Sequence, residues 1–114
     1  MSEFMYLFRG GAEARGEATP DEMQAHMEKW GAWMRSLGEQ GKFVAGLPLH
    51  GEGKVVRNGD LITDGPFTEG KEIVGGYLIV NAADMDEAVE LSKECPIFEH
   101  NGNVEVRQIQ SMEF

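Results

Sequence analysis

Uninterrupted apolar runs mark the predicted strands of the chain. Residues 4–8 form a short run rich in aromatic side chains, and glycines follow directly after it. Runs of this length are typical of buried β-strands. Residues 73–80 and 104–109 predict two further strands, and residues 43–49 predict one that contains Pro48. Because proline is tolerated at edges and strand ends, that strand is expected at an edge.

A helix-start signal appears after the first predicted strand. Thr19 is a suitable N-cap, Pro20 suits the first turn, and Glu22 completes a capping box. The apolar positions that follow recur at steps of four and three, which predicts one stripe facing a core. This stripe consists of Met23, Met27, Trp30, Met34 and Leu37. Gly38 and Gly41 are expected to end the helix.

A second helix and a hairpin complete the pattern. Asp84 with Glu87 repeats the capping box, and the helix that it opens must end before Pro96. Asn58-Gly59 lies between two short apolar pairs and is a strong hairpin signal. It predicts a small β-ribbon inserted between the second and third core strands.

The order of these elements is β-α-β-ribbon-β-α-β. It predicts a single domain over residues 1–114, of the α+β class. The arrangement is the ferredoxin-like split βαβ, an antiparallel sheet with two helices on one face. Its first and third core strands should lie together at the centre.

The two central strands are apolar on both faces. Alternation places Phe4, Tyr6 and Phe8 on one face and Met5 and Leu7 on the other. Two helices cover only one face, so the second needs another cover. We therefore predict a homodimer in which two copies of the sheet pack face to face.

Charge and cysteine content limit the partners. The 114 residues carry a formal net charge of −10, which argues against nucleic acid and anionic membrane surfaces as partners. No apolar run approaches the roughly 20 residues of a membrane-spanning helix. One cysteine, Cys95, has no partner for an internal disulfide, so the cytoplasm is the expected location. It precedes a proline at a helix end and is expected to be structural.

The segment before the third core strand gathers turn residues and acids. Asp64, Glu69 and Glu72 lie within nine residues of one another in the sequence. One interpretation is a solvated turn in which Asp64 caps free amides. The other is a cleft in which neighbouring carboxylates raise one another's pKa toward the working pH.

Among the histidines, His26 is the best candidate for acid–base chemistry. It lies at the border of the apolar stripe, on the same flank as Trp33. It can be a simple hydrogen-bonded border residue, or a general base or acid in a pocket walled by Trp30 and Trp33. His50 and His100 are expected at the surface, and the spacing of the three predicts no metal site.

Glycine patterns support no phosphate site. The chain has neither a dinucleotide-binding glycine motif nor a Walker-type lysine motif. Gly75-Gly76 within a strand indicates the close approach of another backbone or a ligand.

Several motifs in order resemble the YCII-related proteins, in the branch named for its Asp-Gly-Pro-Phe motif. The resemblance runs from Phe4 to Ile109. It rests on Gly46-Leu47 with Leu49, Asp64-Gly65-Pro66-Phe67, Glu69, Lys71-Glu72, Gly76-Tyr77, Asp86-Glu87-Ala88, Pro96 and Val104-Glu105-Val106-Arg107.

The resemblance implies a dimeric α/β barrel built from ferredoxin-like subunits. It also implies an acid–base pair, which falls on His26 and Asp64. The chain departs from the narrower branch by having Met23-Gln24-Ala25 where an arginine precedes the histidine, and Cys95-Pro96 where an aspartate is expected. The side chains expected to bind a substrate are Trp30, Trp33, Glu69, Glu72 and Tyr77.

Three functions remain open on sequence alone. The first is a small-molecule enzyme without cofactor or metal, which uses His26 and Asp64 for elimination, isomerisation or oxygenation. The second is a regulatory module that senses a ligand or docks a protein, since relatives resemble companions of alternative sigma factors. The third is a structural dimer without a site.

Overall fold

The computed structural model describes residues 1–10, 17–59, 61–63 and 73–112. A four-stranded antiparallel sheet forms its centre, in the order β2-β5-β1-β6. The strands of this sheet are β1 (Ser2–Arg9), β2 (Phe43–Pro48), β5 (Val74–Ala82) and β6 (Asn103–Gln108). Strand β2 lies at an edge, and β1 and β5 lie side by side at the centre, as predicted.

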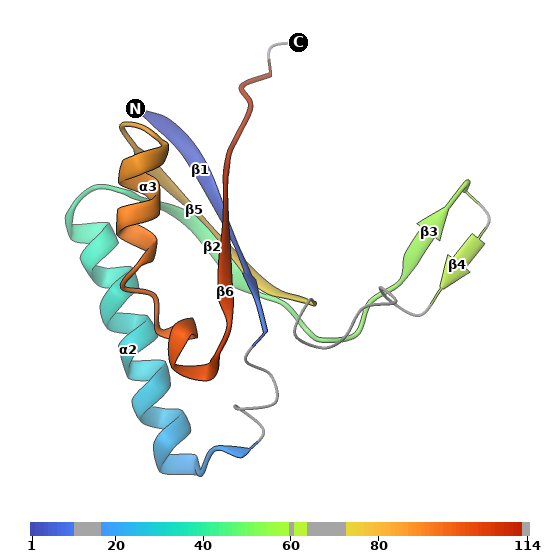
Figure 1. Ribbon diagram of the computed structural model, residues 1–114, viewed down its shortest axis with the longest axis horizontal. Coiled ribbons are helices and arrows are strands. Elements are labelled where there is room, and N and C mark those ends of the chain that lie inside the picture. The colour runs from blue at the N-terminus through green and yellow to red at the C-terminus, as the bar shows by residue number, and fades with distance from the viewer. Residues whose placement is uncertain (11–16, 60, 64–72, 113–114) are drawn as a thin grey trace.

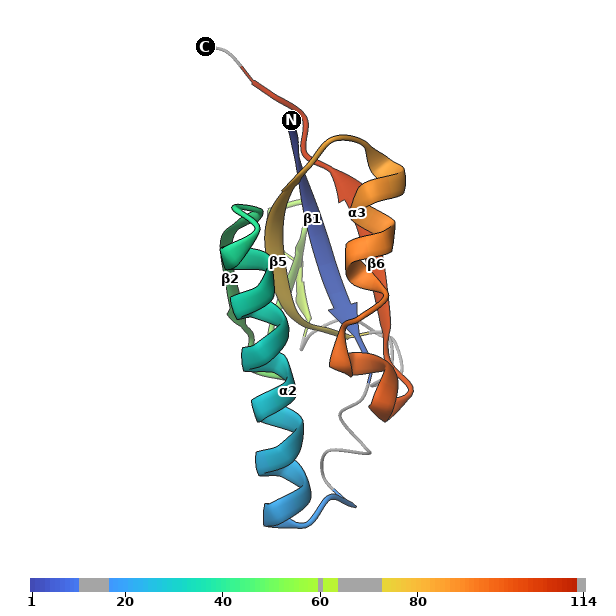
Figure 2. The same cartoon turned by 90° about the vertical axis from the view of Figure 1, so that its left-hand side faces the viewer.

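Two helices cover one face of this sheet. They are α2 (Pro20–Glu39) and α3 (Met85–Ser92), and both lie on the same side in Figures 1 and 2. The ferredoxin-like α+β arrangement is therefore confirmed. None of the helices in the described ranges is long and apolar enough to cross a membrane.

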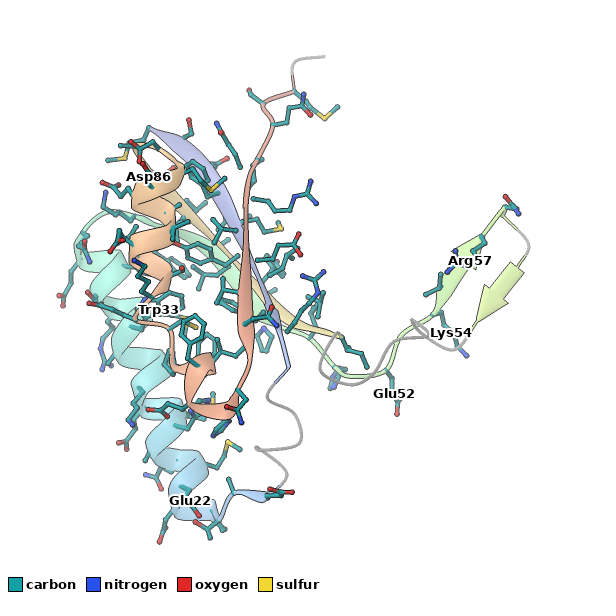
Figure 3. All side chains as sticks on the ribbon, viewed as in Figure 1. Glu22, Trp33, Glu52, Lys54, Arg57 and Asp86 are labelled. Carbon is teal, nitrogen blue, oxygen red and sulfur yellow. The ribbon has the colours of Figure 1, made fainter. Side chains whose placement is uncertain are left out.

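The predicted ribbon is present. It pairs β3 (Val55–Arg57) with β4 (Leu61–Thr63) and stands away from the sheet in Figure 1. Asn58 and Gly59 both have positive φ, of 52° and 78°, as a type I′ turn requires. Figure 3 shows Glu52, Lys54 and Arg57 along this projecting part of the chain.

The first helix begins as predicted and ends later. Thr19 accepts a hydrogen bond from the Glu22 amide, and the Glu22 carboxylate accepts one from the Thr19 amide, so the capping box is complete. Of the two glycines predicted to end the helix, Gly38 still lies within α2, which continues to Glu39, and Gly41 follows the C-cap residue Gln40 and ends it. The φ of Gly41 is 71°.

The second helix has half of the predicted capping box. Asp84 accepts from the Glu87 amide at 2.9 Å. The Glu87 carboxylate does not return to the Asp84 amide. It accepts from the Ala83 amide at 3.1 Å and from Lys42 Nζ at 2.7 Å, and so ties α3 to the start of β2. This ion pair replaces the local bond that the motif predicted.

The apolar stripe of α2 is shifted from its predicted phase. The buried residues of the helix are His26, Trp33 and Leu37, whereas Met27 is 56% exposed. The period of the pattern was correct, but the helix is rotated so that His26 faces inward. The remaining core comes mainly from the helix-facing side of the sheet, with Phe4, Tyr6, Phe8, Leu78, Val80 and Ala82.

The opposite face of the sheet is not covered by the helices. Tyr77 pairs with Leu7 and with Leu47, and Ile79 pairs with Met5, so these positions share that face. Leu47 is 62% exposed, and the other positions are partly exposed. The two-faced apolar character predicted for the central strands is therefore present.

Strands β2 and β5 approach closely at glycines. A Cβ at Gly46 would lie 2.8 Å from the Tyr77 carbonyl oxygen and 3.1 Å from Leu78 Cα. A Cβ at Gly76 would lie 3.2 Å from the Leu47 carbonyl oxygen. The close backbone approach that Gly75-Gly76 predicted is confirmed at Gly76.

The Gly46 contact predicts a stability difference between two glycine-to-alanine variants. Gly46→Ala must displace strand backbone and should destabilise the fold by about 1–3 kcal/mol. Gly31→Ala, within α2 and with no atom within 4 Å of its new Cβ, should stabilise it by about 0.5–1 kcal/mol. Urea denaturation of both variants checks this, and equal effects would contradict the close approach.

The ion pair between Lys42 and Glu87 predicts a pH dependence. The hydrogen bond from Lys42, followed by that from Ala83, lowers the pKa of Glu87. A lowered pKa in the folded state means that the charged form stabilises the fold at neutral pH, and that this contribution is lost as the pH falls through the folded-state pKa. Glu87→Gln should therefore lower the melting temperature at about pH 7, and the difference from wild type should shrink at about pH 3.

Glu90→Gln is the matched control for this measurement. Glu90 pairs with Lys93 on the same helix, and both side chains are more than half exposed. Exposed pairs contribute little, so this variant should melt close to wild type at both pH values. An equal loss in the two variants would attribute the effect to helix charge instead of the Lys42 contact.

Candidate functional site

A cavity of about 210 Å³ lies between α2, the sheet and a short 3₁₀ helix, η2 (Pro96–His100). Its apolar wall is formed by Phe8, Met27, Trp30, Met34 and Ile97. Leu47 also lines it, although its register with Tyr77 places its side chain on the opposite face of the sheet. The backbone of the close β2–β5 pair contributes Gly46 and Gly76, so no side chain from these two positions fills the space. The imidazole rings of His26 and His100 also lie on the wall.

His26 is the buried polar group of this wall. Its side chain is 4% exposed, and both ring nitrogens have partners. Nδ1 lies 3.2 Å from Glu99 Oε2, and Nε2 accepts a hydrogen bond from Trp30 Nε1 at 2.9 Å. Since an indole N–H can only donate, Nε2 carries no proton and the neutral ring holds its proton on Nδ1, toward Glu99.

Glu99 joins this histidine to a cation. Its second oxygen accepts a hydrogen bond from Lys29, one turn from His26 on α2. The bond from Lys29, followed by the bond from His26, lowers the pKa of Glu99. The carboxylate therefore stays ionised at neutral pH and orients the His26 ring. Such a carboxylate also stabilises the imidazolium that forms when the unprotonated nitrogen, Nε2, takes up a proton.

The position of His100 differs from the one predicted. It was expected at the surface, but it is half-buried and its ring stacks on that of His26, with centroids 3.9 Å apart and planes 20° apart. His50 is exposed, as predicted. The stacked rings bring His100 of η2 against His26 of α2 at the wall of the cavity.

Of the seven predicted site residues, three lie outside the described residues, three line the cavity, and Trp33 lies in the core. Asp64, Glu69 and Glu72 lie outside the described residues. His26 and Trp30 lie together on the cavity wall, and Tyr77 also lines the cavity, although its register with Leu7 places it on the second face of the sheet.

Trp33 is not among the residues that line this cavity. It is buried in the core, where it stacks on Tyr6 with centroids 6.1 Å apart. Its indole nitrogen donates to the Leu91 carbonyl oxygen at 3.1 Å. Figure 3 shows it among the core side chains next to α2.

Glu99 and His100 are the site residues that sequence reasoning missed. Glu99 lies 73 positions after His26, so no local spacing connects them. Pro96 at the first turn of η2 was the available signal, because proline suits a helix start as well as a helix end. Pro96 was interpreted only as the end of the preceding helix.

In the described part of the chain, neither Cys95 nor a metal-binding cluster forms a second centre. Cys95 is buried, and burial raises the pKa of its thiol to about 12, which suits a structural role. Among residues 1–10, 17–59, 61–63 and 73–112, no group of three or more His, Cys, Asp or Glu side chains is placed to hold a metal ion.

Comparison with solved structures finds 5-chloro-2-hydroxyhydroquinone dehydrochlorinase (TftG) from Burkholderia phenoliruptrix AC1100, in complex with 2,5-dihydroxybenzoquinone. The match has a TM-score of 0.51 and 20% sequence identity, and covers 96% of this chain and 94% of that one. At this identity it shows a common fold. Comparison with curated proteins gives no match. The model of the YCII-related domain matches residues 5–113, more than nine-tenths of the chain, and the chain therefore belongs to the YCII-related family.

Proposed function

We propose that this protein is an enzyme that acts on a small cyclic compound by general acid–base chemistry, with His26 as the proton-transfer group. The observation that carries the proposal is a buried imidazole, held by a carboxylate, on the wall of an apolar cavity. Buried histidines with a carboxylate partner are suited to this role, because imidazole titrates near neutral pH without much tuning.

The hydrogen bonds of the His26 ring support Nε2 as the nitrogen that accepts the proton. The ring proton lies on Nδ1, where Glu99 accepts it, so Nε2 is the nitrogen that takes a proton from the substrate. The charge that develops on the ring is opposed by the Glu99 carboxylate at the other nitrogen. We therefore propose Glu99 as the carboxylate that orients the His26 ring.

The size of the cavity supports a compound with one ring. A dry cavity of roughly 150 Å³ holds one benzene molecule. A volume of about 210 Å³ leaves room for a few substituents on such a ring. The apolar and aromatic wall favours the ring itself, and the polar groups at His26 favour one defined orientation.

The kind of reaction follows from the chemistry available and from the structural neighbour. Elimination, isomerisation and oxygenation all begin with proton removal from the substrate. The neighbour's name, a dehydrochlorinase, favours elimination, in which Nε2 takes the proton and the leaving group departs with its bonding electrons. We propose no cofactor for this step.

The acidic segment remains part of the proposal. Asp64, Glu69 and Glu72 directly precede β5, whose Gly75 lines the cavity. Asp64 is proposed as a second proton-transfer group, and Glu69 and Glu72 as substrate contacts. The sequence Asp64-Gly65-Pro66-Phe67 supports assignment to the branch of the family named for it. One cysteine in the whole chain supports a cytoplasmic location.

We also propose that the protein is a homodimer. The sheet face opposite the helices carries Met5, Leu7, Leu47 and Ile79, which are partly or mostly exposed in one chain. A patch of this kind favours association. A second copy of the same face covers it by two-fold symmetry.

The catalytic proposal predicts a specific loss of turnover. A screen of hydroxylated and halogenated single-ring compounds, read by mass spectrometry, identifies a compound that the wild type converts. His26→Asn should lower kcat for that compound by about 10²- to 10⁴-fold, the usual contribution of a general base. His50→Asn, at the exposed histidine outside this cavity, is the matched control and should keep wild-type turnover. Equal activity of the two variants would remove His26 from the mechanism.

The dimer proposal predicts a charge-sensitive interface. Light scattering of the wild type should give twice the mass of one chain at micromolar concentration. Ile79→Lys places a charge on the uncovered sheet face and should give the mass of one chain. Val89→Lys adds the same charge on α3, at a position that is 36% exposed, and should remain dimeric. A wild type with the mass of one chain would refute the dimer.

A further inference from the structure

The indole N–H of Trp30 is hydrogen-bonded to Nε2 of His26, the nitrogen that accepts the proton in the proposed reaction. The distance between Trp30 Nε1 and His26 Nε2 is 2.9 Å. An indole N–H has no acceptor function, so this bond uses the lone pair that would accept a substrate proton. Protonated His26 would present an N–H to an N–H. The bond to Trp30 must therefore break whenever Nε2 takes up a proton.

The position of the indole is fixed by packing as well as by this bond. Trp30 follows His26 by four residues on α2, so the two side chains share one helix face. The Trp30 ring packs edge to face against Phe8, with centroids 5.1 Å apart and planes at 88°. The ring also lines the cavity, so the covered nitrogen lies where a ligand would have to reach it.

We infer that Trp30 is a positioning residue that covers the proton-accepting nitrogen of His26 and gives way to a ligand that brings its own hydrogen-bond donor. The inference rests on the proposed function, because it concerns the same nitrogen. This role of Trp30 limits the expected ligands to ring compounds that carry an O–H or N–H donor. A ring without a donor fills the cavity but leaves the bond between Trp30 and His26 intact.

A competition between two donors has a measurable consequence. In the wild type, a ligand hydroxyl replaces an existing hydrogen bond to Nε2, so the exchange gains little. In Trp30→Phe the aromatic ring is kept and the competing N–H is removed. A ligand donor then gains one hydrogen bond of ordinary strength, about threefold to tenfold in affinity.

Phenol and toluene are suitable probes, since they have similar size and only phenol carries a donor. Dissociation constants are measured by NMR titration for the wild type, Trp30→Phe and Trp33→Phe. The change in toluene affinity reports the altered wall volume alone. The preference for phenol over toluene should rise about threefold to tenfold in Trp30→Phe. It should stay at the wild-type value in Trp33→Phe, because the Trp33 N–H bonds to Leu91 instead.

A second measurement uses the wild-type protein alone. In wild-type protein, phenol should shift the indole N–H resonance of Trp30 and leave that of Trp33 in place, whereas toluene should shift neither through loss of a hydrogen bond. An unchanged phenol preference in a folded Trp30→Phe, or an unmoved Trp30 resonance with phenol bound, would overturn the inference. Absence of phenol binding to both proteins would overturn it as well.

These outcomes are separate from a failure of the proposed function. The probes bind without turning over, so the competition is measured even if no substrate is ever converted. A raised phenol preference in Trp30→Phe, together with unimpaired turnover in His26→Asn, would keep the positioning role and reject the catalytic one. Loss of turnover in His26→Asn, together with an unchanged phenol preference in Trp30→Phe, would keep the catalytic role and reject the positioning one.

Discussion

The hydrogen bonds on both nitrogens of His26 allow an imidazole to be buried between a helix and the sheet. A buried polar group without partners costs about 1–3 kcal/mol, which is a large part of the stability of a small domain. Here Glu99 binds one nitrogen and Trp30 the other. Because Glu99 belongs to η2, the same ring also joins α2 to the turn before β6. The polar end of the cavity therefore depends on this one side chain.

Local signals predicted most of the fold, since the interactions behind them span few residues. The capping box of Thr19 with Glu22 joins neighbours, and so does the hairpin turn at Asn58-Gly59. The sheet order followed from a general topological rule applied to these elements. The phase of α2 was wrong, because His26 was placed at the border of the stripe, whereas its contact with the distant carboxylate of Glu99 lets it face the interior.

The reliance on local signals also explains why Asp64, and not Glu99, was predicted as the acid partner of His26. Asp64, Glu69 and Glu72 stand together in the sequence and attracted the assignment of a carboxylate partner. Glu99 stands in a five-residue 3₁₀ helix, and no motif in the sequence near it indicates its contact with His26. Only the folded chain brings η2 against α2. The histidine could therefore be identified from its place on a helix pattern, whereas its partner could not.

The cavity itself depends on small residues where two strands meet. Gly46 and Gly76 contribute no side chains to its wall, and Met27 and Met34 of α2 also line it. Larger residues at the two glycine positions would meet the backbone of the neighbouring strand, so the same close approach keeps these positions small.

The two nitrogens of His26 lie in different surroundings, and each meets one requirement of the proposed general base. The carboxylate must stay charged, and Glu99 meets this by keeping 41% of its side chain exposed while Lys29 binds it. The nitrogen that takes the proton must lie in apolar surroundings, where its interactions with substrate are strongest. His26 spans the two environments. One nitrogen faces the partly exposed ion pair and the other bonds to Trp30 at the cavity wall. In the proposed reaction, the charge of Glu99 would therefore act on the proton transfer without itself being buried.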